Sequence, residues 1–270
     1  MNDAYRKTAV EAALAGGNVL AANVGRLKRS DVRRKGGVDW VTRIDHLSEE
    51  RILRVIRRRF PGDAIVAEES APAASVCDRQ WFVDPLDGTV NFIHGFPMFC
   101  VSIGFAHKGV LQVGAIYDPL RKELFTASRG QGAYLNKKRI SVIAGGAGLQ
   151  GVLVTTGFPF RASRQIDLYL ESFRRVFMKT GTIRRAGSAA LDLAYTACGR
   201  AGGFWEMALS PWDMAAGALL IQEAGGRVSN FFGGPSYLSD GHIAAGSRVV
   251  HKELVRILTP VFRGKLAGGR

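Results

Sequence analysis

The chain has 270 residues, enough to bury a large core in one or two domains. Its apolar fraction of 47% and charged fraction of 22% exclude a disordered or fibrous protein. Three widely spaced cysteines, Cys77, Cys100 and Cys198, fit no zinc or disulfide pattern, so we expect reduced thiols. Without a secretory signal or an apolar run of membrane-spanning length, a cytoplasmic protein with no membrane partner is expected.

The formal net charge is +14 at pH 7, which favours anionic partners such as phosphorylated metabolites, nucleic acid or acidic proteins. Basic residues concentrate in the segments 26–35 and 57–59. Solvated surface is the simpler interpretation of both segments. Because no aromatic residues interleave with the basic ones in 26–35, nucleic-acid binding is only a secondary hypothesis.

Apolar residues at helical spacing predict two amphipathic helices at the start of the fold, over 4–24 and 47–60. Short apolar runs predict strands over 64–67 and 81–83, each ending in acidic residues. A β-meander follows, with strands expected over 99–106, 110–117 and 123–126, and then a turn-rich stretch that ends near Lys138. The first half is therefore α+β.

Strands and helices alternate in the second half, which predicts an α/β organisation. The expected strands span 152–155 and 203–207, and the expected helices span 166–178, 189–197, 214–224 and 249–258. The change of pattern predicts a boundary near 144–149, with an N-terminal part at 1–146 and a C-terminal part at 147–270. The glycine-rich basic tail, 263–270, carries no recognisable chemistry.

The most informative segment is 84–92, DPLDGTVNF, which follows the predicted strand 81–83. Asp84 and Asp87 flank a turn that Pro85 would shape, and Gly88 would let the backbone approach a ligand closely. Two carboxylates that converge on one point are suited to binding a hard cation.

Other acidic residues stand at the ends of predicted elements. Glu68 and Glu69 follow the strand 64–67, and Asp213 stands where a helix should begin. Taken singly, each has a simpler interpretation: a carboxylate at a strand end is usually solvated, and an Asp at a helix start is usually a cap.

Taken together, these residues resemble the motifs of the inositol monophosphatase family. Glu68-Glu69, Asp84 to Thr89 and Trp212-Asp213 stand in the family's order and at similar spacing. The similarity runs from about Val38 to Gly246. It implies a layered αβαβα sandwich of the sugar phosphatase type.

The resemblance also implies a cofactor of two to three Mg²⁺ ions. One ion would take Glu68, Asp84 and the Leu86 carbonyl, a second would take Asp84, Asp87 and Asp213, and a third would share Glu68. The physical chemistry agrees, since carboxylates crowded into one cleft would repel without cations, and oxygen-only ligands suit magnesium.

By the same resemblance, Asp45, Glu68 and Thr89 are the catalytic residues that orient and deprotonate a metal-activated water. Asp45 could equally be the cap of the helix that follows it, or it could serve both purposes. Gly88 and Thr89 are expected to open a short helix through Ile93 whose backbone amides would hold the phosphate.

For the substrate hydroxyls, the resemblance points to Glu206 and to the segment Gly187-Ser188-Ala189, beside Asp87 and Asp213. The alternative for Glu206 is a surface charge. The family commonly has Thr where this chain has Ser188, and a lysine where Arg34 aligns, which puts substrate preference in doubt.

The leading hypothesis is a lithium-sensitive, homodimeric phosphatase that hydrolyses inositol-1-phosphate with magnesium. Fructose-1,6-bisphosphate or a broader range of sugar phosphates and NADP are alternative substrates, since one metal site can serve several esters. A hypothesis of another class is binding to nucleic acid or the transcription machinery through the basic segment 26–35.

Overall fold

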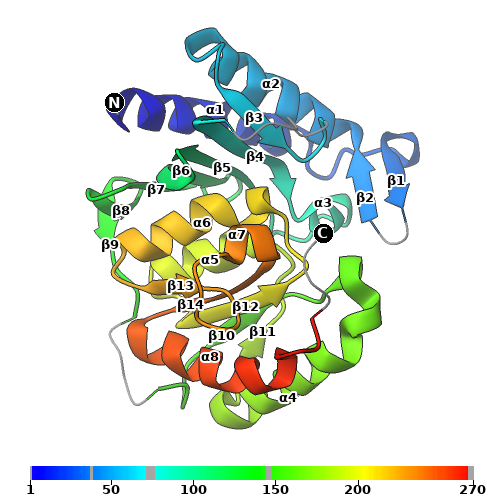
Figure 1. The fold of residues 1–270 in the computed structure, drawn as a ribbon. Helices are drawn as coiled ribbons and strands as arrows, with labels where there is room; N and C mark the ends of the chain where they lie inside the picture. Colours follow the sequence, from blue (N-terminus) through cyan, green and yellow to red (C-terminus); the bar gives the residue numbers. More distant parts are fainter. Residues whose placement is uncertain (1, 37–38, 71–76, 144–147, 267–270) are drawn as a thin grey trace.

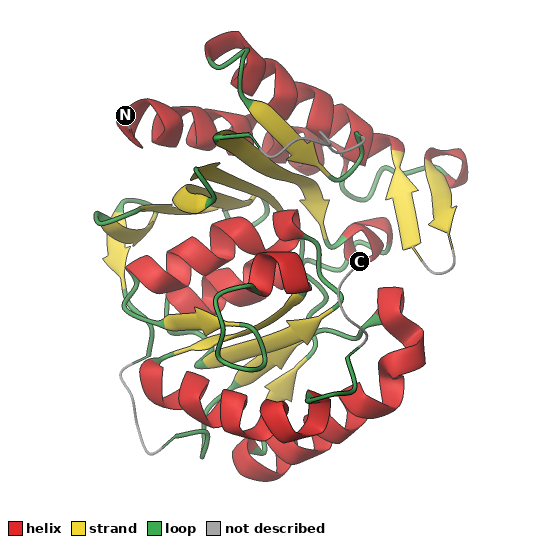
Figure 2. Ribbon diagram, viewed as in Figure 1, coloured by secondary structure: helices red, strands yellow, loops and turns green. Residues whose placement is uncertain are grey.

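The structure, a computed structural model, describes residues 2–36, 39–70, 77–143 and 148–266. Helices and sheets alternate in five layers, as Figures 1 and 2 show. Helices α1 (Asn2–Asn23) and α2 (Arg43–Arg59) cover one face of a seven-stranded sheet. Helices α5 (Ala189–Ala197) and α6 (Pro211–Glu223) separate it from a five-stranded sheet, whose outer face carries α4 (Ile166–Thr180) and α8 (Arg248–Phe262). The predicted αβαβα sandwich is confirmed.

The seven-stranded sheet has the order β3-β4-β5-β6-β7-β8-β9. Its strands are β3 (Ala64–Ala67), β4 (Arg79–Asp87), β5 (Cys100–His107), β6 (Val110–Asp118), β7 (Glu123–Ser128), β8 (Gly132–Leu135) and β9 (Lys138–Ile140). Only β3 and β4 run parallel, and the remaining neighbours form the predicted meander. The stretch predicted as turns up to Lys138 contains β8 and the start of β9, which are too short to show a clear alternation.

The five-stranded sheet has the order β11-β10-β12-β14-β13. Its strands are β10 (Val154–Thr156), β11 (Ile183–Arg184), β12 (Gly203–Met207), β13 (Arg227–Ser229) and β14 (His242–Gly246). The sheet is mixed, because β14 runs antiparallel to both β12 and β13. Sequence analysis missed β11, β13 and β14, as well as the short helix α7 (Tyr237–Asp240).

Further short elements lie outside the two main sheets and the long helices. A two-stranded hairpin, β1 (Val32–Gly36) and β2 (Asp39–Thr42), follows the short 3₁₀ helix η1 (Arg29–Asp31) and was not predicted. Helix α3 (Thr89–Ile93) begins where the sequence predicted, and a second 3₁₀ helix, η2 (Phe160–Gln165), precedes α4. Helix α2 begins at Arg43, four residues earlier than predicted, because Thr42 caps it.

Glycines on the seven-stranded sheet let α6 pack very close to it. A Cβ on Gly104 would lie 2.7 Å from the Ala215 Cβ, and one on Gly114 would lie 2.8 Å from the Ala216 carbonyl oxygen. Larger residues here would push α6 away from the sheet. This close packing brings Asp213, in the first turn of α6, toward the end of β4.

Part of the predicted domain boundary, residues 144–147, lies outside the described residues, so the division at 146 stays a prediction. In the part of the chain that the structure describes, no helix combines the length and the apolar character needed to cross a bilayer.

Candidate active site

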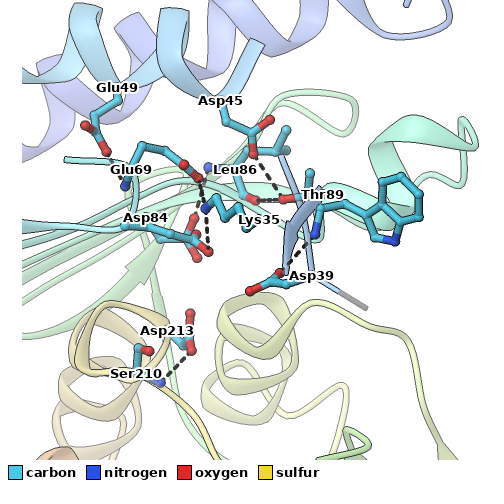
Figure 3. A network of polar contacts seen from close by, with 12 residues as sticks. Lys35, Asp39, Asp45, Glu49, Glu69, Asp84, Leu86, Thr89, Ser210 and Asp213 are labelled. Carbon is cyan, nitrogen blue, oxygen red and sulfur yellow. Dashed lines mark hydrogen bonds and ion pairs between the residues drawn. The ribbon is translucent and has the colours of Figure 1, made fainter. Parts of the chain in front are cut away.

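A cavity of about 220 Å³ opens where β4, α3, β12 and α6 meet. It is lined by Asp39, Trp40, Glu68, Asp84, Leu86, Asp87, Gly88, Thr89, Val90, Asn91, Gly157, Arg185, Gly187, Ser188, Ala189, Glu206, Leu209 and Asp213. The structure thus brings together all the site residues predicted from sequence except Asp45, which lies behind Thr89. Figure 3 shows the polar network on one side of this cavity.

The acidic motif is part of a strand, which corrects the predicted turn at Pro85. β4 continues through Asp87, and its pairing with β5 is irregular between Asp84 and Asp87. The Ser48 hydroxyl donates to the Pro85 carbonyl at 2.8 Å, and the Leu86 amide donates to Asp84 Oδ1 at 3.0 Å. This bulge lets Asp84 and Asp87 both reach the cavity, where strict alternation would have put them on opposite faces.

Asp84 is the most deeply buried acid of the cavity, with 1% of its surface exposed. Burial raises its pKa well above the ordinary value, and the charges of Glu68, Asp87 and Asp213 raise it further. Asp84 and Asp213 face each other from neighbouring layers in Figure 3. A cation among these carboxylates would relieve the repulsion between them.

Asp87 is held in place by the segment predicted to contact the substrate. Its Oδ2 accepts hydrogen bonds from the Ser188 hydroxyl at 2.6 Å and from the Ala190 amide at 2.7 Å. Burial raises the pKa of Asp87 to about 6, although these hydrogen bonds lower it. Ser188 therefore orients an acidic side chain, in addition to lining the cavity.

Asp213 is the third helical residue of α6 and belongs to the capping box that fixes the start of this helix. Ser210 is the N-cap, Pro211 follows it, and the Ser210 amide donates to Asp213 Oδ2 at 2.7 Å. The alternative that Asp213 is the N-cap is therefore wrong: Ser210 is the N-cap, and Asp213 completes the capping box as the third helical residue. The cap fixes the rotamer of Asp213 at the cavity wall.

Asp45 is not the N-cap of α2, one of the two interpretations that sequence left open, although it takes part in the capping box. The N-cap of α2 is Thr42, and Asp45 is the third helical residue, whose Oδ2 accepts from the Thr42 amide at 2.8 Å and from the Thr42 hydroxyl at 2.6 Å. Its other oxygen, Oδ1, accepts from the Thr89 hydroxyl at 3.0 Å. Asp45 thus joins the capped helix to the cavity.

Glu68 and Glu69 are neighbours in sequence but have different surroundings. Glu68 lines the cavity, whereas Glu69 is bound by Lys35 of the β1–β2 hairpin, whose Nζ also lies 3.4 Å from Glu68 Oε1. Burial raises the pKa of Glu69 to about 7, against the effect of its hydrogen bond with Lys35. The Glu69 amide in turn donates to Glu49 Oε2 at 2.9 Å.

The basic residue of β1 that reaches the acids is Lys35, and not Arg34 as the sequence comparison had suggested. Arg34 was aligned with the family's lysine, but its guanidinium lies 5.1 Å from the centre of the Trp40 ring, while the next residue reaches the acids. The alternation of side chains along β1 is the signal that could have found Lys35, had the hairpin been recognised.

On the opposite wall, Glu206 of β12 is buried with 7% of its surface exposed, which excludes the surface-charge alternative. A Cβ on Gly157 would overlap the Glu206 carboxylate, so this glycine makes room for it. Arg185 also lines the cavity and was not predicted.

Gly88 and Asn91 fix the backbone around the start of α3, the first by its conformation and the second by hydrogen bonds. Gly88 has a φ of 90°, and a Cβ there would lie 2.7 Å from the Met98 carbonyl, so both conformation and space require glycine. Asn91 Nδ2 donates to the Met98 carbonyl at 2.7 Å and to the Ala186 carbonyl at 2.9 Å. Helix α3 is thereby tied to the loop that precedes Gly187.

Known proteins are similar to this chain in sequence and in fold. The sequence profile of the inositol monophosphatase family matches residues 1–261. The chain belongs to this family. The protein named "Nus factor SuhB" from Pseudomonas aeruginosa is 46% identical over 257 residues, which cover 93% of this chain and 94% of that protein. Nus factor SuhB from Escherichia coli K12 is 45% identical over 248 residues, or 92% of each chain.

Solved structures of the inositol monophosphatase family agree closely with this fold. The extragenic suppressor protein suhB from Bartonella henselae has a TM-score of 0.90 and 38% identity, covering 97% of this chain and 99% of that one. Inositol monophosphatase from Anabaena has a TM-score of 0.86 and 40% identity, covering 96% of each chain. Family and fold together identify the chain as a phosphatase of the phosphoric monoester hydrolase class.

Family members generally use Mg²⁺, and the donor chemistry of the cavity fits that ion. Its acids offer only oxygen ligands. Burial first, and then the charges of neighbouring carboxylates, raise the pKa values of Asp84 and Asp87, and a bound dication would favour their charged forms. Among the described residues, no three Asp, Glu, His or Cys side chains already form a group ready to coordinate a metal ion. The fit therefore rests on donor type, charge and the shared cavity.

Proposed function

We propose that the protein is a magnesium-dependent phosphatase that hydrolyses inositol-1-phosphate or a closely related polyol phosphate. The observation that carries this proposal is the shared cavity, in which Glu68, Asp84, Asp87 and Asp213 meet beside the start of α3. These four side chains and the Leu86 carbonyl would hold two to three Mg²⁺ ions. When bound, the ions would supply charge stabilisation and a water of lowered pKa.

The chain's own contribution to proton transfer would come from Thr89, Asp45 and Glu68. The Thr89 hydroxyl has one hydrogen and two acceptors, Asp45 Oδ1 at 3.0 Å and the Leu86 carbonyl at 3.1 Å. With its hydrogen directed to Asp45, the hydroxyl oxygen can accept a hydrogen bond from the attacking water. Glu68, at the cavity wall, would take up the proton.

Substrate recognition would use two sides of the cavity. The amides of Gly88 and Thr89 would bind the phosphate, and the Gly187-Ser188-Ala189 segment would contact the substrate beside Asp87 and Asp213. Glu206 is well placed to accept hydrogen bonds from polyol hydroxyls. Arg185 adds a positive charge to the same wall, which favours anionic substrates.

A substrate panel tests the proposal. Phosphate release would be measured with and without Mg²⁺ for inositol-1-phosphate, fructose-1,6-bisphosphate, NADP and a nucleotide 3'-phosphate. We expect the highest kcat/KM for inositol-1-phosphate and no turnover in excess EDTA. Preference for fructose-1,6-bisphosphate or NADP would favour the alternative substrates. Absence of magnesium-dependent release from all four would refute the proposal.

A second candidate function is binding to the transcription machinery. Relatives at 45–46% identity carry the name Nus factor, and Arg26, Lys28 and Arg29 are exposed in the basic segment. Salt-dependent binding to RNA or RNA polymerase that is lost on replacing these three residues with Gln would support this role. Binding that is undetectable or insensitive to salt would exclude it.

The expected cytoplasmic location, homodimer and lithium sensitivity stay predictions. They can be checked by fractionation, light scattering and phosphate release in the presence of Li⁺.

A further inference from the structure

A second cavity, of about 310 Å³, shares no lining residue with the acidic site. It is lined by Arg6, Thr126, Ala127, Ser128, Gln131, Gly132, Tyr134 and Lys137. Arg6 belongs to the N-terminal turns of α1, and the other residues belong to β7, β8 and the turns that follow them. Figure 1 shows this end of α1 near the β7 and β8 end of the sheet.

The strand register accounts for the polar character of the cavity. Ser128 pairs with Gly132 and Thr126 pairs with Tyr134, so these residues share one face of the sheet. Ala127 and Ala133 belong to the apolar core that contains α5 and α6, on the opposite face. Polar residues are therefore placed on the face that carries Arg6, and the apolar ones are buried behind them.

Two buried donors of the cavity residues have no hydrogen-bond partner in the described part of the chain. The Ser128 hydroxyl is one of them, in a residue with only 2% of its surface exposed. The other is Arg6 Nε, although Arg6 Nη2 is paired with Asp3 at 2.7 Å. Because buried polar groups are nearly always hydrogen-bonded, two unpaired donors at one cavity indicate that it receives an acceptor.

The charge around the cavity favours an anionic acceptor. Arg6 and Lys137 line it, and no carboxylate is among its described lining residues. Two carboxylates contact lining residues from outside, since Asp3 is paired with Arg6 Nη2 at 2.7 Å and Glu223 accepts from the Gly132 amide at 2.8 Å. A third cation is close, since a Cβ on Gly132 would lie 3.2 Å from Arg139 Nη2. Arg6, Ser128 and Lys137 come from α1, from β7 and from the turn after β8.

We propose that this cavity binds a phosphoryl group, either as inorganic phosphate or as part of a small phosphomonoester. Ser128 Oγ and Arg6 Nε donate hydrogen bonds to its oxygens, and Lys137 supplies a further positive charge. The volume exceeds what four oxygens need, so the remaining space accommodates the alcohol part of an ester. This site is independent of the catalytic cavity and of the proposed hydrolysis.

Titration calorimetry on the full chain in excess EDTA tests the proposal, with inorganic phosphate and glycerol 2-phosphate as separate ligands. Without metal ions, the acidic cavity repels both anions, so saturable one-site binding reports the second cavity. We expect Ser128→Ala and Arg6→Gln each to weaken binding by about tenfold, the loss of one charge-assisted hydrogen bond. Tighter binding of the ester identifies a phosphomonoester as the ligand, and equal or weaker binding identifies free phosphate.

Arg26→Gln is the matched control, because it removes the same charge from an exposed position outside the cavity. It should leave the affinity unchanged. Thermal melting with and without phosphate distinguishes a serine that binds the ligand from one with a purely structural role. Ser128→Ala should melt at the wild-type temperature or higher without phosphate, because it removes an unpaired hydroxyl, and it should lose the stabilisation that phosphate gives the wild type.

Three results would overturn the assignment. They are the absence of saturable binding to the wild type, an affinity of Ser128→Ala within about twofold of wild type, and equal weakening by Arg26→Gln. The last result would mean that net charge alone attracts the anion.

Discussion

The Thr89 hydroxyl donates a hydrogen bond to Asp45 Oδ1 at 3.0 Å, across 44 positions of sequence. Asp45 is buried and fixed by Thr42 through its other oxygen, so it has little freedom to follow Thr89 if that residue moves. The capped start of α2 therefore fixes the position of Asp45, and Asp45 in turn orients the Thr89 hydroxyl at the cavity wall. This relationship gives the first of four predictions.

Replacing Thr89 with Val should lower kcat by about 10² to 10⁴-fold, the usual contribution of a positioned proton-transfer group. Thr89→Ser retains the hydroxyl and should keep most of the activity. Steady-state kinetics on both variants, with melting curves to confirm folding, would check this. Equal activity of the Val and Ser variants would contradict a role for the hydroxyl.

Asp84→Asn should lower kcat/KM by about a hundredfold or more, because it removes a central ligand charge. The same change should leave the melting temperature in EDTA unchanged or higher, because it removes a buried charge that Glu68, Asp87 and Asp213 repel. The control is Glu50→Gln, an exposed acid on α2. Normal turnover of Asp84→Asn at low magnesium would exclude Asp84 as a ligand.

Lys35→Met should reduce the Mg²⁺ concentration needed for half-maximal activity, on the order of tenfold, because the ammonium beside Glu68 repels an incoming dication. The side chain is 25% exposed, so solvent weakens the effect. Magnesium titrations of activity would measure it, with the exposed Arg33→Met on the same strand as control. An unchanged or higher magnesium requirement would show that Lys35 does not compete with the ion.

We expect the free energy of unfolding to depend on pH through the buried Asp192. Burial raises its pKa well above 3.8, and Glu206 and Asp87 add to the effect, while its Oδ1 has no partner among the described residues. The folded state therefore holds the proton more tightly, and the free energy of unfolding falls as pH rises from 3.8 through the folded pKa.

Asp192→Asn removes this titration and should be more stable than wild type at pH 8 by about 1–3 kcal/mol, with little difference near pH 4. Urea denaturation at both pH values would measure this difference. A gain of stability that is the same at pH 4 and pH 8 would show that Asp192 does not titrate as described.

Much of the fold and of the site is encoded in local sequence. Helical spacing identified the long helices, and the acids at the ends of β3 and β4 and in the first turn of α6 were found from the residues that flank them. Capping residues such as Thr42 and Ser210 act over three positions, so a linear pattern contains them. The strands β11 and β13 are too short for any periodicity, and their existence depends on their neighbours.

Tertiary structure alone decided which side chains surround the acids of the cavity and how deeply each acid is buried. The contacts of Lys35 with Glu68 and Glu69, and of Ser188 with Asp87, join segments 33 to 101 positions apart. Such contacts follow from how closely the layers pack, as at Gly104 and Ala215, and not from any local preference. The pKa of a carboxylate depends on burial and on neighbouring charges, and both are fixed only when the layers come together.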